Sequence, residues 1–380
     1  MRYSLMAGSR NHVLRAVVCA SSSVFLCASM ALGAKKPVQL IRASVPLPEA
    51  SLLDVQISVF GAEETGPFPE IQAAEARYMP VRLKDGLQSS RFWGVVHVVP
   101  KSSIPELSIS GVIISSTSRE LKLRLRAVDA TGKVWLNKNY KQKADATSYL
   151  GKDPNDEPFQ DLYHRIANEL AKKYRKLDHE DLARIRTVSR LRFAAYLAPE
   201  TFDGYVTSKK KSRYEVARLP SHEDPMLLRV DRIRQRDGMF LDAVDTHYAD
   251  FHARMIDAYH GWRSTDYWER EAMKSRSSRT VGGAGWTLGG VTRGPLCGTP
   301  GIFGSPTVDD QRRYAASQER DHVHILSELG ASLASDVAPL VLEVDGKVLR
   351  LEGSVATQYA RWRELLREIF AAETGTTSRD

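Results

Sequence analysis

The chain has 380 residues, with 54 lysines and arginines against 46 acidic residues and a formal net charge of +8. The positive excess is small and spread out, and no basic helix or aromatic platform accompanies it. The composition therefore argues against a nucleic-acid-binding protein.

The first 34 residues predict a cleaved secretory signal. Three arginines lead into an apolar run from 16 to 32, and Ala34 offers a small-residue cleavage point before two lysines. Cleavage near Ala34 would lower the net charge from +8 to about +5, because the segment holds three arginines and no acidic residue. A permanent membrane anchor is one alternative. A lipid-modified Cys19 or Cys27 is another, although no small residue precedes either cysteine.

The exported form would keep only Cys297, so no internal disulfide can form and hydrophobic cores must supply the stability. Its length of about 345 residues suits two or three domains. No other segment is long and apolar enough to span a membrane.

Residues 107–144 predict three consecutive antiparallel strands. From Leu121 to Val128, small or apolar residues alternate with lysine and arginine, which is typical of a strand with one buried and one solvated face. Asp129-Ala130-Thr131-Gly132 predicts the turn that follows.

These strands belong to a predicted domain spanning residues 50–178. The other elements expected in it are a strand at 53–60, a helix at 70–89, a strand at 92–99 and a closing helix at 158–177. Pro80 should kink the first helix or split it into two. The order β-α-β-β-β-β-α predicts an α+β fold, a mixed and largely antiparallel sheet with helices on one face.

Two sequence segments of this domain resemble those of a known family. Residues 93–100 (WGVVHVVP) and 128–135 (VDATGKVW) are similar to the small periplasmic α/β domain of the curli-secretion lipoprotein, of LpoB and of the TolB N-terminal domain. The whole chain also resembles a group of uncharacterised exported proteins of proteobacteria. The resemblance implies an accessory role in the cell envelope and supplies no catalytic residues.

Residues 179–275 predict a helical region. A long helix begins at Asp224-Pro225, and apolar residues recur three and four apart from Leu227 to Trp262, as in a coiled coil. We expect this helix to form a hairpin with the preceding one, which Asp178 can cap. A dimer or partner surface along the same seam is the alternative. Lys209-Lys210-Lys211 predicts a solvated turn, with a wall- or lipid-binding patch as the alternative.

Two groups on the long helix could carry chemistry. Asp245, His247, Asp250 and His252 have spacings that suit a metal site, but exposed polar residues opposite an apolar seam produce the same pattern. The aromatic-basic run from Tyr259 to Arg270 suits a packed cap better than a carbohydrate platform.

Residues 276–312 are rich in glycine and predict a flexible linker rather than a membrane-packing segment; Cys297 lies there with no predicted role. Residues 313–373 predict a small α-β-β-α unit around an Asp345-Gly346 hairpin. It is similar to BON-like modules, and its thin core should lean on the middle helices.

No short motif of a hydrolase, zinc enzyme or nucleotide-binding loop occurs, so we predict no catalytic, cofactor-binding or metal-binding residues. The sequence therefore predicts an exported accessory or binding protein in the periplasm or at the outer-membrane periphery of a Gram-negative bacterium. Its partner would be an envelope protein or a cell-wall component, with peripheral membrane contact and homo-oligomers also open. The alternatives are a wall- or polysaccharide-active enzyme, using the Asp245 side or the 262–268 aromatics, and a structural oligomer on the 227–262 helix.

Overall fold

The computed structural model describes residues 36–63, 69–101, 103–150, 157–209, 213–221, 223–281, 320–331, 339–344 and 347–375. All of these except residue 36 belong to one compact unit, Pro37–Asp380. The predicted signal, the three cysteines and most of the glycine-rich segment lie outside the described residues. Among the described helices, none combines the length and the apolar character needed to cross a bilayer.

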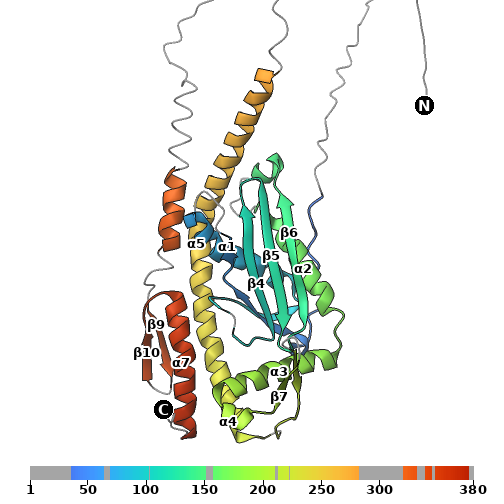
Figure 1. Cartoon of the computed structure of the whole chain (residues 1–380), viewed down its shortest axis with the longest axis vertical. Helices are drawn as coiled ribbons and strands as arrows, with labels where there is room; N and C mark the ends of the chain where they lie inside the picture. Colours follow the sequence, from blue (N-terminus) through green and yellow to red (C-terminus); the bar gives the residue numbers. More distant parts are fainter. Residues whose placement is uncertain are drawn as a thin grey trace, which may run out of the picture. The chain divides into compact units, whose positions relative to one another are not determined.

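A mixed sheet with the strand order β3-β1-β4-β5-β6 lies at the centre of the first domain, and a short β2 pairs with β4. The strands are β1 (Leu53–Ser58), β2 (Gly61–Ala62), β3 (Trp93–Val99), β4 (Leu107–Ser116), β5 (Glu120–Asp129) and β6 (Val134–Lys143). β1 runs parallel to β3 and β4, whereas β4, β5 and β6 form the predicted antiparallel meander (Figure 1). The predicted α+β class with a mixed sheet is confirmed.

Asp129 closes the β5–β6 hairpin. Its Oδ1 accepts hydrogen bonds from the backbone N–H groups of Thr131 and Lys133 at 2.9 and 3.1 Å. Its Oδ2 accepts one from the indole of Trp135 at 2.7 Å. Gly132 takes a φ of 81°, which glycine adopts without strain. The predicted turn is therefore confirmed.

Two helices, α1 (Pro69–Ser90) and α2 (Gln160–Tyr174), cover one face of the sheet. In β5, the residues that face them, such as Leu121 and Leu123, are fully buried, while Arg124 on the other face is exposed. Pro80 lies within α1, which is one continuous helix, so of the two expected outcomes, a kink or a split, the split is wrong. The helix continues because the residues around Pro80 are buried, and that packing outweighs one lost backbone hydrogen bond.

The chain enters this unit as an extended segment along α2. Asn168 holds the segment at two points: its Oδ1 accepts the Ile41 N–H at 2.7 Å, and its Nδ2 donates to the Gln39 carbonyl at 2.8 Å. One turn earlier on α2, His164 Nδ1 lies 2.8 Å from the Val38 carbonyl. The segment that follows the predicted cleavage point is thus fixed by side chains.

The helical middle contains α3 (His179–Leu197), α4 (Pro199–Phe202), the hairpin β7 (Val206–Lys209) and β8 (Arg213–Val216), and α5 (Pro225–Val281). Asp178 caps α3 as predicted, since its carboxylate accepts the Asp181 N–H at 2.7 Å. Lys209 ends β7 of a short hairpin that we did not predict. The two strands have only four residues each, too few for a clear alternation of apolar and polar residues.

α5 runs well past Trp262 and past the predicted boundary at 275. The seam residues are at most 6% exposed: Leu227, Val230, Ile233, Leu241, Val244, Tyr248, Phe251, Met255, Tyr259 and Trp262. They are covered by the chain itself, mainly through α1, β3 and the C-terminal α7 (Val355–Thr374). The ion pair and hydrogen bond that tie α5 to α3 lie near its start, at Asp231 and Arg234, so the expected hairpin is confined to that end.

The long helix also covers the free edge of β3. Asp245 accepts the outward Val98 N–H at 2.8 Å and forms an ion pair with Lys84. Asp242 Oδ1 lies 2.8 Å from His97 Nε2. Covering an edge strand in this way removes a template for pairing with other chains.

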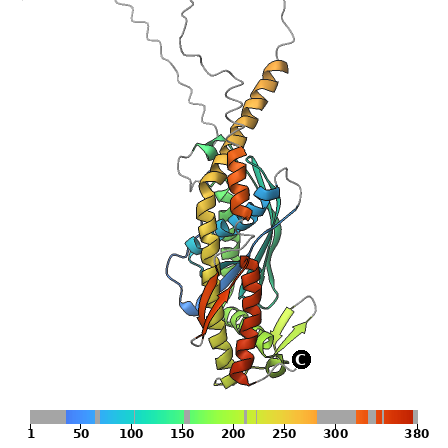
Figure 2. The same cartoon turned by 90° about the vertical axis from the view of Figure 1, so that its left-hand side faces the viewer.

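The C-terminal unit follows the predicted order, with a helix at 320–331, then β9 (Leu340–Val344), β10 (Lys347–Leu351) and α7. Ser354 caps α7 and accepts the Thr357 N–H at 3.2 Å. Trp362 stacks on Phe240 of α5 with ring centroids 4.9 Å apart. The unit leans on α5 as expected, and Figure 2 shows α7 alongside it.

Candidate functional site

The outer face of the sheet, the side of β4, β5 and β6 turned away from α1 and α2, is open to solvent in the part of the chain that the structure describes. Ser110, Arg124, Arg126, Asn137 and Asn139 all point outward and are exposed. In Figure 1 these three strands lie in front of α2. Such a face is a preformed surface, because the strand ladder fixes it.

A row of cations runs along the middle of this face. Lys122, Arg124 and Arg126 alternate with buried residues of β5, so successive charges lie about 7 Å apart along the strand. We refer to these three residues as the cation row. On β6, Asn139 lies opposite Arg124 and Asn137 opposite Arg126. On β4, Ser110 also lies opposite Arg126.

Two acidic residues pair with part of the row. Glu120 pairs with Lys122 at 2.8 Å and with Lys141 at 2.7 Å, and hydrogen bonds from these two lysines lower the pKa of Glu120. Glu63 pairs with Arg124 at 2.9 Å, where the arginine side chain is 48% exposed. The guanidinium of Arg126 contacts no acidic partner among the described residues. The row is therefore only partly neutralised, by pairs that water reaches.

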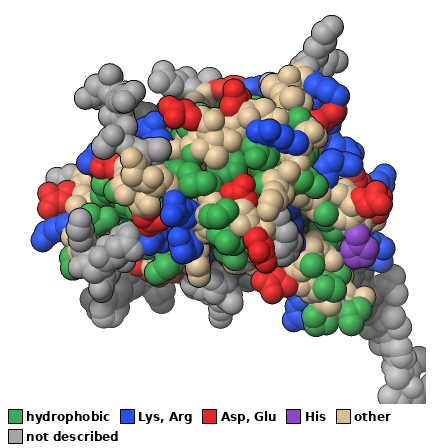
Figure 3. All heavy atoms as spheres, turned by 90° about the horizontal axis from the view of Figure 1, so that it is seen from below, with side chains coloured by type: hydrophobic (Ala, Val, Ile, Leu, Met, Phe, Trp, Pro, Cys, Tyr) green, Lys and Arg blue, Asp and Glu red, His purple; other side chains and the backbone are tan. Residues whose placement is uncertain are grey.

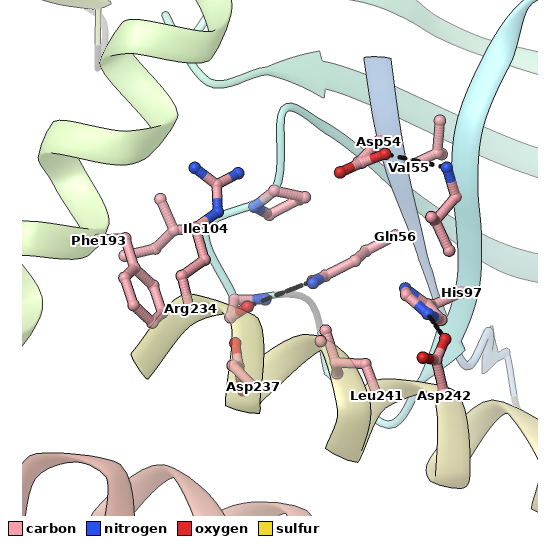
Figure 4. A pocket seen from close by; sticks show the side chains of 14 residues that line it. Asp54, Val55, Gln56, His97, Ile104, Phe193, Arg234, Asp237, Leu241 and Asp242 are labelled. Carbon is pink, nitrogen blue, oxygen red and sulfur yellow. Dashed lines mark hydrogen bonds and ion pairs between the residues drawn. The ribbon is translucent and has the colours of Figure 1, made fainter. Parts of the chain in front are cut away.

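A second candidate is a cavity of about 170 Å³ near the start of α5 (Figure 4). It lies between β1, β3, residues 103–105, α3 and α5. Its polar lining residues are Asp54, Gln56, His97, Ser103, Arg234, Asp237 and Asp242. Several ionisable side chains thus meet at one place, which makes the cavity the first position to examine for catalysis.

The ionisable side chains that line this cavity form hydrogen bonds and ion pairs with neighbouring parts of the chain. Asp54 Oδ1 accepts the Val95 N–H at 2.9 Å, and His97 contacts Asp242 as described above. Asp237 accepts bonds from Trp362 Nε1 at 3.1 Å and Arg363 at 3.0 Å. Burial raises the pKa of Asp237, although Arg363 opposes that shift. Asp237 therefore serves to dock α7 on α5.

The described lining residues also include no activated nucleophile. Ser103 is the hydroxyl-bearing residue in it, and its Oγ donates to Gln56 Oε1 at 3.3 Å rather than to a histidine. Nucleophilic catalysis needs a base within hydrogen-bond reach of the nucleophile. The described lining can bind small polar groups, but it does not assemble such a pair.

A buried ionic cluster joins α5 to the far end of β4. Arg263, fully buried, pairs with the buried Glu75 at 2.7 Å and donates to the Thr117 carbonyl at 2.6 Å. Glu75 also accepts bonds from Tyr259 at 2.7 Å and Ser116 at 2.6 Å. The charge is neutralised and every contact is internal, so the cluster holds elements together and offers no open site.

Glu157 forms the centre of a neighbouring cluster. Tyr78 donates to it at 2.9 Å, and His260 Nε2 lies 3.7 Å away. Burial disfavours the ionised form, but His260, Arg82 and Arg263 outweigh it and lower the pKa of Glu157 to about 2. The carboxylate is thus held ionised as a structural anion and cannot act as a general acid near neutral pH.

The four residues weighed as metal ligands do not converge. Asp245 binds Lys84 and the Val98 N–H, while the ring of His252 stacks on Tyr78 at 4.5 Å. His247 is half-buried and Asp250 is exposed. Over the described ranges, no group of three or more candidate ligands is placed to hold a metal ion.

The aromatic run at the end of the seam is largely packed, as expected. Trp262 and Tyr267 are each 6% exposed, and Tyr267 stacks on Tyr149 with ring centroids 4.7 Å apart. Trp268 alone of these three is exposed, at 42%. One isolated ring does not form a carbohydrate platform.

Sequence reasoning identified the solvated face of β5, but it missed both the cavity and the buried clusters. Arg263 offered a signal, because it lies one turn beyond Tyr259 on the buried side of the helix. Charged residues beside an aromatic run are more often exposed, so the pattern alone did not separate the two cases.

No protein-family model matches the chain, and no curated protein matches it. Among solved structures, it is similar to the hypothetical protein CT253 from Chlamydia trachomatis, with a TM-score of 0.24 and 11% sequence identity. That similarity covers 32% of this chain and 95% of the other. A TM-score this low assigns neither fold nor function. The resemblances to the TolB-N and LpoB type of domain and to BON-like modules stay predictions.

Proposed function

We propose that this chain is an exported, non-catalytic accessory protein of a Gram-negative cell envelope, which binds an envelope component through the outer face of its sheet. The observation that supports the proposal is the exposed surface of β4, β5 and β6, where polar and basic side chains stand on a fixed strand ladder. A preformed surface loses little conformational entropy when a partner binds.

The other surface considered for binding is less suitable. The apolar seam of α5 is buried within its own chain, so a partner or a second copy would have to displace α1 or α7 to reach it. A wall-active enzyme has less support as well, because Asp245 is engaged by Lys84 and the cavity lining pairs no nucleophile with a base.

Co-sedimentation with isolated envelope fractions tests the proposal, using the protein without its predicted signal (residues 35–380). Ser110→Trp places a bulky side chain at the middle of the outer face without changing its charge, and tryptophan is tolerated in strands. We expect this variant to bind envelope fractions at least fivefold more weakly, whereas Ser110→Ala, at the same position, should bind like the wild type.

Circular dichroism establishes that both variants are folded. Wild-type binding by a folded Ser110→Trp variant would contradict the use of this face. N-terminal sequencing of protein recovered from the periplasm tests export separately, and a start near residue 35 is expected.

A further inference from the structure

We infer that the component bound by the outer face is a linear polyanion, a polymer with a phosphate or carboxylate on successive units. The inference rests on the proposed function and names the partner of the same face. It comes from the arrangement of the cation row, its weak existing ion pairs and the uncharged residues opposite its two arginines.

The row matches a linear partner in shape. Lys122, Arg124 and Arg126 lie on one strand and share one face, with about 7 Å between successive positions. A compact anion cannot span the whole row. An extended polymer can lie along β5 and meet all three, so its affinity gains from each contact.

The present partners of the row can be exchanged. Exposed ion pairs such as Glu63 with Arg124 contribute little to stability, since water screens them. Among the described residues, Arg126 has no acidic partner to give up. A guanidinium can bind a phosphate or carboxylate through two parallel N–H bonds, which makes both arginines well suited to such groups.

The strand positions directly opposite the two arginines carry no charge: Asn137 and Asn139 on β6, and Ser110 and Val112 on β4. Among the described residues, the acidic side chains that pair with the row are Glu63 and Glu120. The view from below differs: Figure 3 shows acidic and basic side chains interspersed with hydrophobic ones. Three cations with two acidic partners leave a net positive charge on the row, which attracts a polyanion more strongly than a surface of balanced sign does.

Fluorescence-detected titration of residues 35–380 tests the inference with three probes: polyphosphate, polygalacturonate and neutral dextran. We expect saturable binding of at least one charged polymer and none of dextran. The two charged polymers distinguish phosphate from carboxylate as the recognised group. Raising sodium chloride from about 50 to about 500 mM should remove most of the binding, because salt screens such contacts.

A matched pair of double variants locates the site. Arg124→Gln with Arg126→Gln should weaken binding of the charged polymer at least tenfold. Lys172→Gln with Lys173→Gln removes the same charge from exposed positions on α2 and should change the affinity less than twofold.

The outcomes separate this inference from the proposed function. If neither charged polymer binds, or if the arginine double variant binds like the wild type, the polyanion inference is overturned. In that event, loss of envelope binding by Ser110→Trp would still support the face as a binding surface. If Ser110→Trp leaves envelope binding intact, the proposed function falls, whatever the polymers do.

Discussion

Arg263 and Arg126 carry the same guanidinium in opposite surroundings. Arg263 is fully buried and bound to Glu75, whereas Arg126 stands exposed on the outer face of the sheet. Removing a charge from water costs several kcal/mol, which only close internal partners can offset. Arg126 keeps its hydration and needs no internal partner. Burial therefore decides which arginine holds the fold and which is available to a ligand.

The largest expected loss of stability comes from replacing the buried arginine, Arg263. Arg263→Met would leave the Glu75 carboxylate buried without its counter-charge, and such changes cost about 3–5 kcal/mol of unfolding free energy. Urea unfolding measures the loss. Arg126→Met, the matched change on the outer face, should stay within about 0.5 kcal/mol of the wild type.

Adding Glu75→Gln to Arg263→Met should recover part of the lost stability, since it removes the uncompensated charge. A loss below about 1 kcal/mol for Arg263→Met alone would show that the cluster is not structural.

Acid should lower the free energy of unfolding as the buried His252 becomes protonated. Burial, followed by the charges of Arg82 and His260, lowers the pKa of His252 to about 4, against an ordinary value of 6.5, while Glu157 opposes the shift. The unfolded chain therefore binds this proton more readily between pH 6.5 and 4, so stability falls as the pH falls through that range. The full loss is about 3 kcal/mol, at about 1.4 kcal/mol for each pKa unit.

His252→Phe tests the assignment, because it keeps a ring that can stack on Tyr78 and removes the titrating group. The stability of this variant should change much less between pH 6.5 and 4 than that of the wild type. His324→Phe, at an exposed position of the helix at 320–331, should keep the wild-type profile. Below pH 4.5, loss of the Glu157 carboxylate, whose pKa is about 2, should destabilise both variants further.

A smaller effect should distinguish the two faces of β4 at adjacent residues. A Cβ at Gly111 would lie 2.7 Å from the ring of Phe60 and 2.8 Å from the Leu125 side chain. Gly111→Ala should therefore cost about 1–3 kcal/mol through overpacking. Ser110→Ala, one residue earlier and pointing outward, should cost no more than about 0.5 kcal/mol. Equal unfolding midpoints in urea for the two variants would contradict the assignment of the faces.

The strands could be predicted where a short sequence pattern alone determines the structure. The alternation from Leu121 to Val128 and the Asp129–Gly132 turn each specify their structure within a few residues. The covering of α5 was not predictable in this way. Periodicity shows that one side of a helix is buried, but not which element lies on it, and here α1, β3 and α7 cover most of the seam.

The candidate site was partly predictable for the same reason. The pattern placed Lys122, Arg124 and Arg126 on a solvated face, because each is separated from the next by one apolar residue. It did not place Asn137, Asn139 and Ser110 beside them, since that depends on the register of β5 with its two neighbours. The pairing of Glu75 with Arg263 links positions 188 residues apart, a distance that no local pattern spans.

A small change in stability is also expected at the acidic residue beside the cation row. Glu120→Gln removes a carboxylate that pairs with Lys122 and Lys141, whose side chains are 38% and 51% exposed. Both lysines can return to water, so the unfolding free energy should change by less than about 1 kcal/mol. Affinity for the charged polymer should rise instead, because two cations lose their competing anion. Urea unfolding and polymer titration measure the two effects on one variant. A loss of unfolding free energy above about 2 kcal/mol would show that this exposed ion pair stabilises the fold as the buried cluster does. The contrast between the exposed and the buried arginine would then be wrong.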